Sequence, residues 1–178
     1  MIGLALVAPG AARAETPTCA GCLLGVYDDR AMTRTSGTCG PFQTKSIYLG
    51  IRLGSEVSDY QSMEFRAGYP DGFTLLDWTS FVPNARVQPT SDGGVRVEWA
   101  DCVRGTRALF QVRFISFASV SDARVQVHDA VLETCAASGA GTWRIPGGCY
   151  VLNPSGHGDP CATSVAASTW GAVRQLFR

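Results

Sequence analysis

Charged residues are scarce in this chain, and neither sign prevails. They make up 17% of the 178 residues, and fifteen basic side chains balance fifteen acidic ones, whereas an average soluble domain carries about 25%. A chain without net charge has no long-range attraction for polyanions, so there is no electrostatic reason to expect nucleic acid or an anionic membrane as partner. We therefore expect neither.

Histidine is also scarce, with two in the chain, and this narrows the catalytic options. His128 falls on the outward phase of an expected strand, where a solvated surface residue is the simplest interpretation. His157 lies in the segment 155–159, where Asp159 can orient the imidazole as in a catalytic triad. The GxSxG elbow that presents a nucleophilic serine is missing. We predict a protein without catalytic activity and keep a small extracellular hydrolase using His157 and Asp159 as an alternative.

Helical periodicity is missing from 45–131, where apolar and polar residues alternate instead. In 47–53 every odd position is aliphatic and Arg52 faces the other way. The same period of two recurs at 63–67, 95–99, 110–114 and 124–128. Such alternation predicts half-buried strands, and the paired glycines of the segment 91–94 suit a tight hairpin turn.

Further strands are expected at 23–27, 73–78 and 149–152, which brings the count to about eight or nine. No segment between them is long and periodic enough for crossover helices, so the sheets should be mainly antiparallel. The sequence thus predicts an all-β fold, an antiparallel two-sheet β-sandwich or jelly roll. We place this domain at 15–135 and interpret 136–167 as an irregular, cysteine-linked segment that holds the last strand.

The first fourteen residues are apolar and end in Ala12-Arg13-Ala14, a pattern that signal peptidase cleaves. We expect a signal peptide at 1–14, cleaved after Ala14, and a secreted, periplasmic or cell-surface protein. The basic n-region that precedes such a stretch is missing, which suits a start inside a longer signal peptide. The stretch is too short to span a bilayer, so we expect no membrane span. A buried apolar strand is the alternative.

Seven cysteines in an exported chain predict disulfides, because the compartment outside the cytoplasm is oxidising. They are Cys19, Cys22, Cys39, Cys102, Cys135, Cys149 and Cys161. The sequence does not give their pairing, but we expect the last three to link the loop-rich end of the chain. Because the count is odd, one thiol is free or joins another chain, which gives a second alternative function, a disulfide-linked assembly component with one reactive cysteine.

Cys19 and Cys22 form a CxxC motif, which is redox-active in thioredoxin-like proteins. That role needs the motif at a helix start within a βαβ unit, and here it precedes an expected strand. A metal site of four thiols would need a second CxxC, which the chain lacks. We therefore predict structural disulfides, no metal centre of this kind and no cofactor.

Four acidic residues near the ends of expected strands are weak candidates for calcium ligands, namely Asp28, Asp29, Asp59 and Asp101. They can converge at one rim of a sandwich and supply the carboxylate oxygens that Ca²⁺ requires. No DxDxDG loop is present, and isolated acidic residues in loops are usually solvated turn formers.

Aromatic residues supply the candidates for a recognition surface. Trp99 is in phase with Val95 and Val97 and should belong to the core. Trp78 and Phe81 have two interpretations, packing at the core or its rim, and a stacking surface for a glycan or protein of the cell envelope.

The last eleven residues, 168–178, have a different pattern from the rest. Trp170, Val173 and Phe177 share one face of a short amphipathic helix that Ser168 can cap. A helix this short is stable only when it docks. It either packs on its own sandwich or presents Trp170 and Phe177 to an export or assembly partner.

Two motifs carry a family resemblance. Residues 25–29 (GVYDD), Cys39, residues 41–42 (PF) and the strand 47–53 resemble the opening of uncharacterised exported bacterial proteins with a cohesin-like, immunoglobulin-like β-sandwich. The ending 170–178 (WGAVRQLFR) is similar to the tails of the same group. The resemblance implies a cohesin-like fold and an exported protein, and it carries over no catalytic residues. Cohesins bind dockerin partners, but this chain has no dockerin-like calcium repeat.

Together these observations predict a non-catalytic secreted binding or structural module of the cell envelope or extracellular space. It would act through its sheet faces and loops, on a protein or glycan partner. The candidate binding residues are Trp78, Phe81, Trp170 and Phe177.

Overall fold

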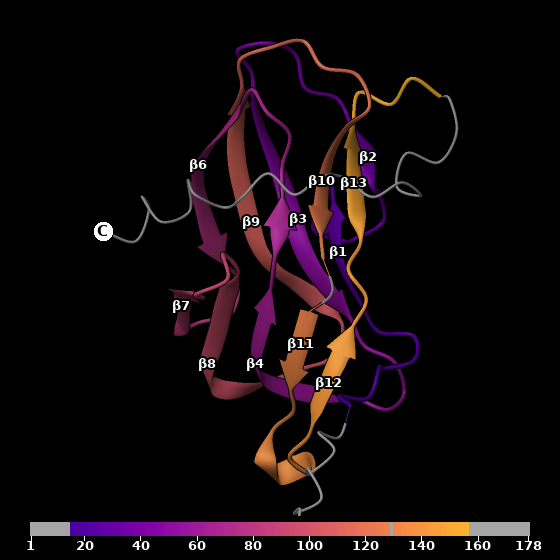
Figure 1. Ribbon diagram of the computed structural model, residues 1–178, viewed down its shortest axis with the longest axis vertical. Coiled ribbons are helices and arrows are strands. Elements are labelled where there is room, and N and C mark those ends of the chain that lie inside the picture. The colour runs from indigo at the N-terminus through magenta and orange to yellow at the C-terminus, as the bar shows by residue number, and fades with distance from the viewer. Residues whose placement is uncertain (1–14, 129, 157–178) are drawn as a thin grey trace, which may run out of the picture.

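The computed structural model describes residues 15–128 and 130–156, and in these ranges the protein is all-β (Figure 1). Thirteen strands and one short 3-10 helix, η1 (Ala136–Ser138), make up the regular structure. No helix in the described ranges is long and apolar enough to cross a membrane. The predicted signal peptide (1–14), the pair His157 and Asp159, and the tail 168–178 with its expected helix lie outside the described residues.

The first layer is a four-stranded antiparallel sheet in the order β1-β3-β9-β6. Its strands are β1 (Leu23–Tyr27), β3 (Thr44–Arg52), β9 (Arg107–Ser116) and β6 (Phe73–Ser80). β3 and β9 are the central strands, and β6 is the edge strand on one side.

The second layer consists of two short sheets placed end to end (Figure 1). One has the order β12-β11-β4-β8-β7 and the other the order β2-β13-β10-β5. The strands are β4 (Asp59–Phe65), β5 (Ala67–Gly68), β7 (Ala85–Pro89), β8 (Val95–Arg104), β10 (Ala123–Val127), β11 (Ala130–Glu133), β12 (Thr142–Ile145), β13 (Cys149–Leu152) and the short β2 (Ser36–Gly37). Three stretches of chain, β4 to β5, β10 to β11 and β12 to β13, each contribute one strand to either sheet, and the strands lie in the same order in both sheets. The two sheets therefore form one layer with a break in its middle.

The alternation in the sequence accounts for this architecture. In β8, Val95, Val97 and Trp99 are buried, while Arg96 and Glu98 lie on the outer side. The predicted core position of Trp99 is therefore confirmed. β10 follows the same rule with Ala123, Val125 and Val127. The apolar sides of the two layers face each other and form a single core, which confirms the predicted antiparallel sandwich.

Five short strands were not predicted, namely β2, β5, β7, β11 and β12. β12 lies inside the segment 136–167 that we interpreted as irregular, and its four residues pair with β11. Four alternating residues between glycines give too weak a pattern to identify a strand, and tertiary pairing decides the outcome. β12 and β13 also complete the layer that contains β4 and β10, so the expected boundary at residue 135 falls within that layer.

The disulfides correct one prediction and support another. Cys19 pairs with Cys22, as expected for a structural CxxC. Cys135 pairs with Cys102 rather than within the C-terminal third, because β8 and the end of β11 lie on either side of β4 and bring these residues together. Cys149 is also disulfide-bonded, and Cys161 lies outside the described residues.

Cys39 is expected to resist thiol reagents in the native protein. Its side chain is buried, and its Sγ lies 3.5 Å from the carbonyl oxygen of Gln43. Burial raises the pKa of the thiol, an effect that Lys45 only partly offsets. Since the thiolate is the reactive form, Ellman's reagent should detect Cys39 only after unfolding in urea without reductant.

A Cys39→Ser variant is the matched control, because it removes the thiol that appears on unfolding. Rapid reaction of Cys39 in the folded protein would contradict this expectation and restore the disulfide-linked assembly component as a function. A buried thiol of raised pKa argues against that alternative.

Candidate functional site

The outer face of the first layer carries polar side chains and two aromatic ones. Thr79, Gln111 and Tyr48 are in register across β6, β9 and β3 and face outward. The Nε2 of Gln111 donates a 2.9 Å hydrogen bond to the Oγ of Ser46 on the same face. We call the outward residues of β3, β9 and β6, together with Phe81, the open face.

An aromatic pair lies at one end of the open face. The rings of Tyr48 and Phe81 stack with their centroids 6.1 Å apart and an interplanar angle of 15°. Phe81 follows β6 and is held by its backbone N–H, which donates to the carbonyl oxygen of Leu109 at 2.8 Å. The guanidinium carbon of Arg30 lies 4.3 Å from the centroid of the Phe81 ring. Aromatic and arginine side chains of this kind are enriched where proteins bind one another.

The loop between β1 and β2 covers the part of this outer face that lies over β1 and the end of β3. Met32 lies directly over Gly50, where an added Cβ would collide with the Sδ of Met32. The Nη2 of Arg52 donates to the carbonyl oxygen of Met32 at 2.8 Å, and the Arg52 guanidinium lies over the ring of Tyr27. Tyr27 is buried under this cover. The open face is therefore limited to β3, β9 and β6.

The outer face of the second layer carries a larger network of charges that neutralise one another. Arg96 forms ion pairs at 2.9 Å with both Glu98 and Glu133, and Glu64 lies 3.9 Å away. Ser62 donates a further hydrogen bond to Glu133. This hydrogen bond and the neighbouring Arg96 outweigh burial and lower the pKa of the Glu133 carboxyl. The network is satisfied within the protein.

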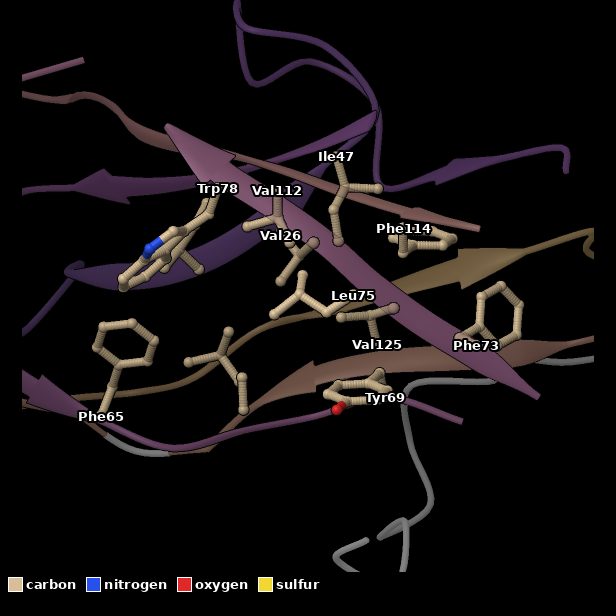
Figure 2. A pocket seen from close by; sticks show the side chains of 13 residues that line it. Val26, Ile47, Phe65, Tyr69, Phe73, Leu75, Trp78, Val112, Phe114 and Val125 are labelled. Atoms are coloured by element: carbon tan, nitrogen blue, oxygen red, sulfur yellow. The ribbon is translucent and has the colours of Figure 1, made fainter. Parts of the chain in front are cut away.

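Trp78 faces the interior of the sandwich rather than the open face. Its ring stacks on Phe110 with the centroids 4.9 Å apart and an interplanar angle of 17°. It borders an apolar cavity of about 60 Å³ between the layers, which Phe65 and Val125 line from the opposite side (Figure 2). A small cavity lined by carbon atoms belongs to the core. This position suits the packing interpretation of Trp78, whereas Phe81 lies on the outside.

The four acidic residues proposed for calcium are not brought together. Asp29 accepts hydrogen bonds from Thr33 and Arg34 within its own loop. Asp59 accepts one from the backbone N–H of Cys135. In the described ranges, the one group of three metal-ligating side chains within 4.8 Å of one another is Asp59 with Cys102 and Cys135, and those two sulfurs form a disulfide.

Asp28 serves a structural role at the end of β1. Its carboxylate accepts a 2.6 Å hydrogen bond from the hydroxyl of Tyr150 and pairs with Lys45, and Arg34 lies 3.3 Å away. Burial disfavours its charge, but these three partners outweigh that effect and lower the pKa of the carboxyl. Asp28 thereby joins the two layers, because Tyr150 is on β13 and Lys45 is on β3.

Of the predicted binding residues, Phe81 lies on the open face, and Trp170 and Phe177 lie outside the described residues. Sequence reasoning missed Tyr48, Gln111 and Arg30. A tyrosine on the polar phase of the strand 47–53 was the one signal for Tyr48, and it is a weak one, because single apolar residues are common on protein surfaces. Arg30 stands in a loop, where no periodic pattern indicates its position.

Known structures with a similar fold are cohesins. The first is the cohesin module of a family 33 glycoside hydrolase from Clostridium perfringens, with 19% identity and a TM-score of 0.52 over 78% of this chain and 99% of that one. The second is the type I cohesin OlpC of Clostridium thermocellum in complex with a dockerin, with 10% identity and a TM-score of 0.52 over 80% of this chain and 99% of that one.

A third is the sixth cohesin of scaffoldin B from Acetivibrio cellulolyticus, in complex with a Cel5 dockerin, with 13% identity and a TM-score of 0.51 over 76% of this chain and 99% of that one. No protein-family model matches the sequence, and no curated protein matches it. The structural likeness shows that this chain has a cohesin-like β-sandwich fold.

Proposed function

We propose that this protein is a secreted, non-catalytic module that binds another protein through its open face. The observation that carries the proposal is the Tyr48 and Phe81 pair, which lies on an outward sheet face beside the exposed Thr79. Flat polar surfaces with a few aromatic anchors are typical of protein interfaces, where such anchors contribute most of the binding energy.

Two further observations support the proposal. Two of the similar cohesins are in complexes with dockerins, so this sandwich architecture can present a protein-binding surface. The disulfides Cys19–Cys22 and Cys102–Cys135 are typical of an oxidising compartment, which supports a location outside the cytoplasm.

A charge placed beside the aromatic pair of the open face should weaken partner binding strongly, because Thr79 lies in register with Gln111 and Tyr48. The immobilised protein is used to capture a partner from an extract of the cell envelope and medium of its own organism, and mass spectrometry identifies that partner. Thr79→Arg should weaken its binding by at least about tenfold, and Tyr48→Ala by a similar factor. Surface plasmon resonance with the purified partner gives the Kd values.

Val131→Arg is the matched control, since Val131 is exposed on the outer face of the second layer. It introduces the same side chain and should leave the Kd within about twofold. Equal losses for Thr79→Arg and Val131→Arg, or no loss for either, would contradict the assignment of the open face. Circular dichroism and thermal unfolding confirm that each variant is folded.

A further inference from the structure

The apolar cavity between the layers reaches one edge of the sandwich, between β5 and β6. β6 is the edge strand of the first layer, and β5 is the edge strand of its sheet in the second layer. Both strands line the cavity (Figure 2). Phe65 and Val125 line it and are buried. Tyr69, Leu75 and Trp78 line it as well but are only half-buried. We call these three residues the edge strip, because they form the part of the core that solvent reaches at this edge.

The opposite edge of the sandwich is linked by backbone hydrogen bonds. The backbone N–H of Leu24 on β1 donates to the carbonyl oxygen of Pro146 at 3.0 Å, and that of Gly148 donates to the carbonyl oxygen of Leu24 at 2.8 Å. These bonds join β1 to the segment between β12 and β13 of the second layer. In the described ranges, no backbone hydrogen bond joins β6 to the second layer. The two edges therefore differ in how the described chain holds the layers together.

The described ranges end near the edge strip. The carboxylate of Asp122, the residue before β10, accepts hydrogen bonds from the backbone N–H and the hydroxyl of Ser155 at 2.8 and 2.6 Å. β10 is the direct neighbour of β5, so the two strands lie about 5 Å apart. Thirteen residues, 157–169, separate Gly156 from Trp170, and an extended chain of that length spans up to about 45 Å. The tail 168–178 is therefore long enough to reach the edge strip.

The tail also has side chains that suit the edge strip. Trp170, Val173 and Phe177 share one face in the helical periodicity that the sequence predicts. Aromatic rings pack favourably on one another, and Tyr69 and Trp78 contribute two rings to the strip. A segment tethered to the same chain has a high effective concentration at a nearby site, so it occupies that site ahead of a free partner of similar chemistry.

We propose that the tail 168–178 covers the edge strip, with Trp170 and Phe177 packed on its side chains. The tail is then the last element of the domain and not an extension that binds a partner. The proposal does not depend on the proposed function, because the edge strip lines the interior of the sandwich and the open face lies on the outer side of the first layer. Either one can fail without the other.

A photo-cross-linker at position 177 tests this contact in the full chain. Phe177 is replaced by p-benzoylphenylalanine, the protein is irradiated, and mass spectrometry of the digest maps the linked peptides. Links to the segment 67–80 of the same chain are expected, because benzophenone reacts with C–H bonds that it touches. The same replacement at Gln175 is the matched control, and it should link to 67–80 at least about fivefold less, since this residue lies off the apolar face.

A mixture of ¹⁵N-labelled and unlabelled chains separates links within one chain from links between two chains. Links between chains would overturn the proposal in favour of a second copy as the occupant. Links from position 177 to other segments alone, or equal links from positions 175 and 177, would overturn it too.

Negative charges on the apolar face of the tail should expose the edge strip. The double variant Trp170→Asp/Phe177→Asp should raise the fluorescence of ANS, a dye that binds exposed apolar surface, by at least about threefold. Ala172→Asp/Gln175→Asp adds the same charge to the other face and should leave the dye fluorescence nearly unchanged. An equal rise for both double variants, or no rise for either, would count against the proposal. Circular dichroism confirms that both variants are folded.

Discussion

Phe110→Ala is expected to lower the free energy of unfolding by about 3–5 kcal/mol, the usual loss when a buried phenylalanine is truncated. Phe110 lies on the central strand β9 and is 1% exposed. Its ring stacks on Trp78 of the same layer and lies 6.5 Å, centroid to centroid, from Trp99 of the opposite layer. Removal of the ring therefore opens a cavity between the layers where three aromatic side chains meet. Urea unfolding followed by tryptophan fluorescence measures the loss.

Phe42→Ala is the matched control for this prediction. Phe42 is 74% exposed and touches Phe117 only edge-on at 6.2 Å, so its truncation should cost less than about 0.5 kcal/mol. Similar losses for the two variants would show that the stack of Phe110 does not stabilise the sandwich as we infer.

Loss of the Cys102–Cys135 disulfide should destabilise the protein nearly as much. The bond closes a loop of 33 residues, and the entropy of closing such a loop in the unfolded chain corresponds to about 3–4 kcal/mol. The double variant Cys102→Ser/Cys135→Ala tests this by urea unfolding under oxidising conditions. Both residues are replaced so that neither thiol is left to pair elsewhere.

The Cys19–Cys22 disulfide provides the comparison, because its sequence separation is only 3. The same entropy relation gives about 1.5–2 kcal/mol for the double variant Cys19→Ala/Cys22→Ala, which keeps both of these buried positions apolar. An equal or larger loss for this variant would contradict the loop-entropy account of both bonds.

Strand existence followed from the sequence where alternation was long and regular. β1 was predicted with its observed bounds, and β8 was predicted from its first residue, Val95. The short strands β7 and β12 depend on pairing with β8 and β11, and pairing with a distant segment leaves no local signal.

Trp78 illustrates why side-chain direction was harder to predict than strand position. The register of β6 against β9 shifts between Leu75 and Asp77, which marks a β-bulge. Before the bulge Phe73 and Leu75 face the core, and after it Trp78 does. A bulge reverses the inward and outward phases, so alternation counted from the start of β6 does not give the direction of Trp78, and the sequence left both of its interpretations open.

The candidate site was predictable in part, through Phe81. Tyr48 lay in a predicted strand, but its partner Phe81 follows a strand that is distant in sequence. Nothing in the sequence therefore indicated that the two rings stack. The ion pairs on the two outer faces were hidden from composition, because fifteen basic and fifteen acidic residues sum to zero however they are distributed. Local charge depends on which arginines find acidic partners in the folded chain.

In the β1–β2 loop, the residues that fix the loop are different from the residue that it presents to the solvent. Asp29 and Met32 fix the loop, whereas Arg30 is exposed and its guanidinium lies over the ring of Phe81. The residue at position 30 can therefore be exchanged at little cost to stability. A single codon change there would therefore alter the charge beside the aromatic pair while the scaffold stays the same.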